Sequence, residues 1–102
     1  MILLITYSLS KPKKYYISLF KLLKSAKSFI AIMKSSYLIE TDESVQAWEE
    51  RILERINDND TFIILDITGI SIYGYLSQKA YDWMEKKQAA RNNNELLISK
   101  GV

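Results

Sequence analysis

Few side chains in this sequence could carry out chemistry, and two of them stand out because they interrupt or end apolar segments. Ser8 follows the apolar run at residues 2–7, and Asp66 lies inside the apolar run at residues 61–67. A carboxylate in an apolar strand is costly unless it is paired or exposed. Asp66 is therefore the candidate catalytic acid, with Ser8 as a polar partner at a strand end. The structural alternatives are a lysine partner or solvent exposure for Asp66, and a turn role for Ser8.

The absence of Cys and His restricts the available chemistry to carboxylates, hydroxyls and lysine. Disulfides, thiol catalysis, Ser-His-Asp triads and zinc sites built from His or Cys are excluded. A catalytic metal would have to be a hard ion such as Mg²⁺, held by carboxylate oxygens. We therefore expect no cofactor, and Mg²⁺ only if the protein is a nuclease that uses Asp66 with Ser8 or Asp60.

Positive charge is concentrated in the first third of the chain. Residues 1–39 contain seven lysines and no acid, whereas residues 40–102 contain seven basic and twelve acidic residues. Such a block predicts an anionic partner, or self-association of opposite faces. Lysine without arginine favours phosphate contacts over base recognition. The alternative is a solvated helix face. The candidate nucleic-acid contacts are Lys11, Lys13, Lys14, Lys21 and Lys24.

Short apolar runs and amphipathic segments alternate along the chain. The strands and helices that they predict determine where the candidate residues lie. Apolar runs rich in β-branched residues predict strands. The expected strands are residues 2–7, about 28–33, 36–41 and 61–67. Residues 28–41 could instead form one long bent strand. Apolar residues at three- and four-residue steps predict helices. These begin after Pro12, after Asp42 as the N-cap, and at about Ser77, the last one continuing to Lys87.

The order β-α-β-β-α-β predicts an α+β, ferredoxin-like fold with a four-stranded antiparallel sheet and two helices on one face. A further C-terminal helix and a possible fifth strand would follow. At 102 residues, one core is expected. We expect a single domain over residues 1–87 and a tail over residues 88–102, which would form an added edge strand or a dimer arm. No secretory signal or membrane span is recognisable, so we expect a cytoplasmic protein.

The strands are apolar on both faces, which leaves one sheet face to be covered. We expect a second subunit, giving a homodimer, or the C-terminal segment to cover it. Tyr7, near the end of the first strand, could stack on a nucleobase or lie in the core or an interface.

Several short motifs carry a resemblance to a known family. They are "ITYSLSKP" at the first strand end, the central "SSYLIET", the strand "DTFIILDIT" and the late "GYLSQKAYDWM". Together they resemble the small bacterial and phage proteins of the SinR family, which are similar to the Cas-two proteins of CRISPR adaptation and to VapD-type ribonucleases. The resemblance covers residues 1 to about 87.

The resemblance implies a homodimer whose sheets pack face to face. It also implies an Asp at the end of the first strand that holds Mg²⁺ for phosphodiester cleavage. Ser8 occupies that position here, and a serine alone seldom holds a hard cation. The chain is thus expected to bind DNA or RNA, or a protein partner, rather than to be an efficient nuclease. The alternatives are a Mg²⁺-dependent nuclease with a reduced site and a phage or plasmid protein that pairs with a host complex.

Overall fold

The structure is a computed structural model that describes residues 1–88 and 96–101. The chain forms two compact units, Met1–Asp66 and Ile67–Val102. The third helix therefore belongs to the second unit, whereas a single domain over residues 1–87 was expected. Of the expected tail, residues 89–95 and 102 lie outside the described residues. In the described part of the chain, no helix has both the length and the apolar character needed to cross a membrane.

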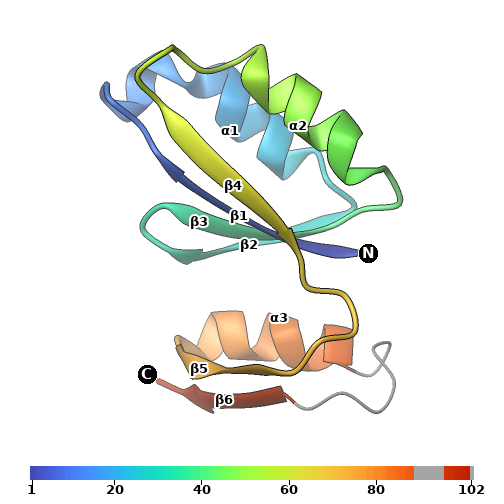
Figure 1. The fold of residues 1–102 in the computed structure, drawn as a ribbon. Coiled ribbons are helices and arrows are strands. Elements are labelled where there is room, and N and C mark those ends of the chain that lie inside the picture. The colour runs from blue at the N-terminus through green and yellow to red at the C-terminus, as the bar shows by residue number, and fades with distance from the viewer. Residues whose placement is uncertain (89–95, 102) are drawn as a thin grey trace. The chain divides into compact units, whose positions relative to one another are not determined.

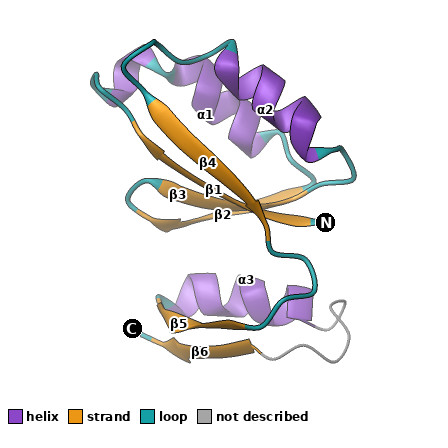
Figure 2. Ribbon diagram, in the orientation of Figure 1, coloured by secondary structure: helices purple, strands orange, loops and turns teal. Residues whose placement is uncertain are grey.

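The first unit is an antiparallel sheet with two helices on one of its faces (Figure 1). Its strands have the order β2-β3-β1-β4, so each helix connects two strands that are separated by a third. This confirms the ferredoxin-like β-α-β-β-α-β arrangement expected from the sequence, which Figure 2 shows by element type. The elements are β1 (Ile2–Ser8), the 3-10 helix η1 (Lys13–Tyr15), α1 (Ile17–Lys24), β2 (Ser28–Met33), β3 (Ser36–Glu40), α2 (Val45–Leu53) and β4 (Thr61–Asp66).

The core of this unit lies between the helices and the sheet. Alternate residues of β1 point toward the helices, so Leu3 and Ile5 are fully buried. Apolar side chains of both helices meet them, as the three- and four-residue spacing predicts. Each fully buried aliphatic side chain contributes roughly 1.5–3 kcal/mol to the folded state. The core cluster consists of Leu3, Ile5, Tyr16, Leu19, Leu22, Leu23, Ile39, Trp48 and Ile52.

The first helix is shorter than the apolar spacing suggested. Pro12 caps the 3-10 helix η1, and α1 begins only at Ile17. Tyr16 separates the two helices, because its backbone has a φ of −122° and its side chain is held by a hydrogen bond to Asp60. At the other end, the Ser25 hydroxyl donates to the carbonyl oxygen of Leu22, and the helix ends.

The second helix is capped by a different residue from the one expected. The Ser44 hydroxyl accepts a hydrogen bond of 3.1 Å from the backbone N–H of Ala47. Ser44 has extended backbone dihedrals, as an N-cap residue should. Asp42, the expected cap, instead lies near Lys27, with 3.8 Å between carboxylate and ammonium. Asp42 and Ser44 are both residue types that cap helices, and only the structure distinguishes which of them is the N-cap.

Within the first unit, β4 is covered on one face only, which is the arrangement expected for a sheet with one face left to be covered. Phe62 and Ile64 pack against the core on the helix side. Ile63 and Leu65 point to the opposite face and are 53% and 45% exposed. One face of β4 is therefore an exposed apolar surface.

The second unit is a β-α-β segment. Its strands β5 (Ile72–Leu76) and β6 (Leu96–Lys100) pair in parallel, and α3 (Gln78–Gln88) connects them. Ala80 and Met84 of α3 are buried. Helix α3 lies where a helix was expected, and β6 forms the possible fifth strand of the tail. β5 was not among the expected strands, because Gly69 and Gly74 interrupt its pattern. Gly69 has a φ of 75°, so this glycine does belong to a turn.

Candidate nucleic-acid interface

The two candidate catalytic residues lie at opposite ends of the sheet. In the antiparallel pairing of β1 with β4, Ser8 is opposite Thr61 and Asp66 is opposite Leu3. Five residues of strand correspond to roughly 16 Å. Both side chains are exposed. Ser8 and Asp66 therefore cannot share one metal site within a single chain.

Asp60, the alternative partner for Asp66, is occupied in a structural network. It is 7% exposed and accepts five hydrogen bonds. Burial alone would raise the pKa of this carboxyl. The backbone N–H groups of Ser10 and Asn57 and the hydroxyls of Tyr16 and Ser10 outweigh it and hold the pKa well below its usual range. Asp60 is a fixed carboxylate that joins the loop after β1 to the start of β4.

The described residues also provide no acidic cluster for a metal. Nowhere in residues 1–88 and 96–101 do three Asp or Glu side chains converge in a way that could hold an ion. In the described part of the chain, the alternative Mg²⁺ site of Asp66 with Ser8 or Asp60 thus belongs to no cluster of three acids.

The five candidate lysines are all exposed. Lys11 precedes η1, Lys13 and Lys14 lie within it, and Lys21 and Lys24 are three residues apart on α1, which places them on one side of that helix. In the described part of the chain, none of the five has an acidic side chain within ion-pair distance. Their charge is therefore available to an anionic ligand.

An exposed tyrosine lies among these lysines, and the sequence analysis missed it. The Nζ atoms of Lys11 and Lys14 lie 5.8 and 5.4 Å from the centre of the Tyr15 ring, and Tyr15 is 61% exposed. Cations beside an aromatic face are attracted by its quadrupole. The run of basic and aromatic residues at 13–16, "KKYY", was the available signal.

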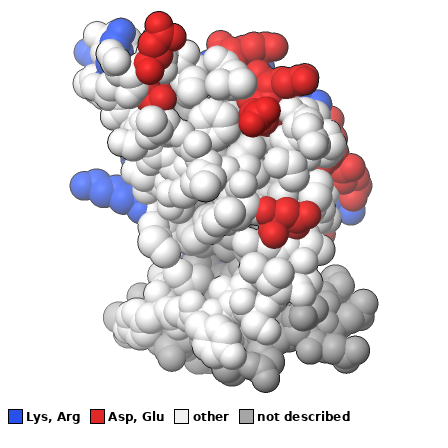
Figure 3. Space-filling model, in the orientation of Figure 1, with Lys and Arg blue, Asp and Glu red and all other residues white. Residues whose placement is uncertain are grey.

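Acidic side chains cover a different part of the first unit. On the face seen in Figure 3, most acidic side chains lie over α2 and the loop that follows it, and basic side chains project at the opposite edge and also lie beside some of the acids. Two of the basic residues outside the five candidates, Lys27 and Arg51, pair with Asp42 and Glu43.

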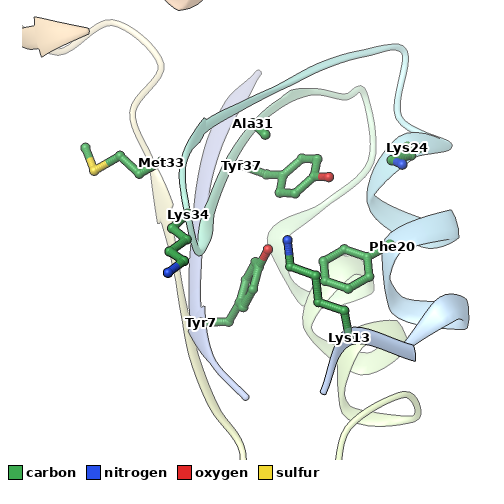
Figure 4. A pocket seen from close by; sticks show the side chains of 8 residues that line it. All are labelled: Tyr7, Lys13, Phe20, Lys24, Ala31, Met33, Lys34 and Tyr37. Atoms are coloured by element: carbon green, nitrogen blue, oxygen red, sulfur yellow. The ribbon is translucent and has the colours of Figure 1, made fainter. Parts of the chain in front are cut away.

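A cavity of about 380 Å³ lies beside the lysines, between α1 and the sheet (Figure 4). Tyr7 is half-buried, packs against the core cluster and also lines this cavity. Burial, and then the neighbouring Tyr37, raise the pKa of Tyr7 to about 12, and burial also raises the pKa of Tyr37. The lining residues are Tyr7, Lys13, Phe20, Lys24, Ala31, Met33, Lys34 and Tyr37.

In comparisons with known proteins, no family model matches this chain, and neither does any curated protein or solved structure. The family resemblance of the sequence motifs therefore stays a prediction.

Proposed function

We propose that this protein binds nucleic acid through the phosphate backbone, using Lys11, Lys13, Lys14, Lys21 and Lys24. The observation that carries the proposal is that these lysines, on η1, on α1 and just before η1, are exposed and have no acidic partner in the described part of the chain. Proteins that neutralise phosphates release counterions, so their affinity depends steeply on salt.

Single strands are the preferred ligand in this proposal, because Tyr15 offers an exposed ring between two lysines. Stacking of a base on an aromatic side chain is sequence-tolerant and contributes about 1–3 kcal/mol per base. An unstacked base could lie on Tyr15 while Lys11 and Lys14 contact the adjacent phosphates. The lysines would supply affinity with little base specificity.

We also propose that the protein is a small Cas-two-like or SinR-like protein without the carboxylate at the end of the first strand. Ser8 stands at the matching position, and Asp66 is at the other end of the sheet. Binding without efficient cleavage is therefore the activity that we propose.

A second copy of the chain is the proposed partner for the helix-free face of the sheet. Ile63 and Leu65 expose apolar side chains on the face of β4 that the helices leave open. Pairing this face with its equivalent would remove both from water, as in the homodimers that the sequence motifs suggest. Sedimentation of the wild type and of Leu65→Lys tests this: a dimer that the substitution dissociates supports it, and a monomeric wild type contradicts it.

The test of nucleic-acid binding measures the affinity for a labelled single strand of about 12 nucleotides between about 50 and 200 mM salt. The double variant Lys11→Gln/Lys14→Gln should bind more weakly. If two phosphate contacts are lost, the slope of log K against log salt should flatten by about 1.4. The matched control is Lys79→Gln/Lys86→Gln, which removes the same charge from exposed positions of α3.

Tyr15 provides a separate readout. Tyr15→Ala should weaken single-strand binding by about 1–3 kcal/mol without changing the salt slope, whereas Tyr15→Phe should retain binding. An unchanged slope in the lysine variant, or an equal loss in the α3 control, would contradict the assignment. Mg²⁺-dependent cleavage that Asp66→Asn abolishes would favour the nuclease, and the absence of any binding at low salt would point to a protein partner.

A further inference from the structure

The cavity beside α1 exists because the helix is short and the neighbouring strand is at the sheet edge. An eight-residue helix is about 12 Å long, so α1 does not cover the whole of β2. On the helix side of β2, Phe29 and Ala31 are exposed, although their partners in β3, Ile39 and Tyr37, lie in or against the core. A register shift between Ala31 and Met33 further alters the strand at this point. The result is a hollow at one end of the helix-side face.

Aromatic rings form one wall of this cavity. The ring of Phe20 lies 6.0 Å from that of Tyr7 in an edge-to-face arrangement and 6.4 Å from that of Tyr37. All three residues are half-buried, so the rings are held by packing while part of each remains accessible. Such a wall can accept a flat, unsaturated ring by stacking.

The polar groups of the cavity favour an anion. Lys13, Lys24 and Lys34 line it, and none of its described lining residues is acidic. In Figure 4, Lys13 reaches from η1 toward the rings of Tyr7 and Tyr37, whereas Lys34 points away. Neither the Tyr7 nor the Tyr37 hydroxyl has a hydrogen-bond partner among the described residues. Tyrosine phenols are protonated near neutral pH, so both hydroxyls can donate to phosphate oxygens.

We propose that this cavity binds one nucleotide, with the base against the rings of Phe20 and Tyr37 and the phosphate at Lys13 and the Tyr7 and Tyr37 hydroxyls. Its volume of about 380 Å³ lies within the usual range of small-molecule sites, roughly 300–1,000 Å³. The same chemistry fits a free nucleoside monophosphate and the unpaired terminal nucleotide of a strand. The inference goes beyond the lysine and Tyr15 contacts proposed above, because it requires no continuous nucleic-acid strand.

The test is calorimetric titration of the full chain with adenosine monophosphate, adenosine and inorganic phosphate. Adenosine monophosphate should bind more tightly than either fragment, because only it engages both the aromatic wall and Lys13. Lys13→Gln should weaken this binding about tenfold, since it removes a charge-assisted contact. Tyr37→Phe keeps the ring and should cost roughly threefold to tenfold by removing one donor. Lys79→Gln, an exposed substitution on α3 outside the cavity lining, should have no effect.

Ala31→Trp tests the cavity itself, because it introduces a bulky side chain at an exposed position of an edge strand. Abolished binding of adenosine monophosphate, with a far-UV circular dichroism spectrum like that of the wild type, would support the site. If the variant does not fold, Lys13→Gln and Tyr37→Phe carry the test.

The source of the nucleotide is decided by comparing free and strand-borne ligands. Binding of adenosine monophosphate would support a free nucleotide. Weakening of a 5′-phosphorylated oligonucleotide by Ala31→Trp, without affinity for the monophosphate, would support a strand end. If Lys13→Gln, Tyr37→Phe and Ala31→Trp change the affinity for neither adenosine monophosphate nor the 5′-phosphorylated oligonucleotide, the proposed site is contradicted. The double variant Lys11→Gln/Lys14→Gln tests the backbone-binding face independently, so the two proposals can fail separately.

Discussion

The hydroxyl of Tyr16 donates a hydrogen bond of 2.8 Å to Oδ1 of Asp60, 44 residues further along the chain. This bond links the start of α1 to the turn before β4. Ser10 donates its backbone N–H and its hydroxyl to the same oxygen of Asp60. The loop that follows β1, which carries Lys11, is thus anchored to a buried carboxylate.

Asp60→Asn should destabilise the protein by about 2–3 kcal/mol in chemical denaturation at neutral pH. The amide has one acceptor oxygen, so donors that now share two carboxylate oxygens would lose a partner. Asp58→Asn, an exposed change in the same turn, should have little effect. Equal stability of the two variants would contradict a structural role for Asp60.

The same carboxylate predicts how stability depends on pH. The folded-state pKa of Asp60 lies below its ordinary value of 3.8, so its contribution is present above that value and is lost as pH falls through the folded pKa. The stability difference between wild type and Asp60→Asn should therefore narrow as pH decreases below about 5. A difference that stays constant from pH 7 into this acidic range would refute this sign.

Thr41→Val should cost about 1–3 kcal/mol, because it would leave a buried donor unpaired. Thr41 Oγ1 accepts a bond of 3.0 Å from the indole N–H of Trp48, and both residues are buried. Thr41→Ser keeps the hydroxyl and should retain most of the stability. Urea unfolding followed by tryptophan fluorescence measures both variants, and a Val variant as stable as the Ser variant would show that the bond is unimportant.

Ser44→Ala should reduce the free energy of unfolding by about 1 kcal/mol, since it removes the N-cap of α2. Ser44→Asp should be close to the wild type, because Asp also caps well. Asp42→Ala removes only an exposed ion pair with Lys27 and should change stability by less than about 1 kcal/mol. A larger loss for Asp42→Ala than for Ser44→Ala would restore Asp42 as the cap.

Alkaline titration of the tyrosinate absorbance should show one tyrosine ionising near pH 12, and Tyr7→Phe should remove it. The raised pKa means that the neutral phenol is favoured in the folded state, so its contribution to stability is lost as pH rises from 10 through 12. Tyr7→Phe should lose less stability over this range. The groups that share the cavity, Tyr37, Lys13, Lys24 and Lys34, remain in both proteins. A variant with the same titration curve would show that another tyrosine ionises last.

Local pattern predicted most of the first unit. β2 and β3, which begin at Ser28 and Ser36 as expected, follow from the apolar runs and the polar turn between them. β5 escaped prediction because glycines break its pattern and its parallel partner β6 begins some twenty residues later. The beginning of α1 was misplaced because the hydrogen bond that fixes Tyr16 comes from Asp60, a residue distant in sequence.

The residue types available to the candidate site follow from the sequence alone, whereas the tertiary structure determines which of these residues lie close together. The absence of His and Cys and the run of lysines are properties of the chain and need no fold. Antiparallel register placed Ser8 and Asp66 at opposite ends of the sheet, and packing of α1 beside β2 brought Lys13 and Lys24 to Tyr7 and Tyr37. Residue types and periodicity are local, whereas strand register and the reach of a helix depend on contacts between distant segments.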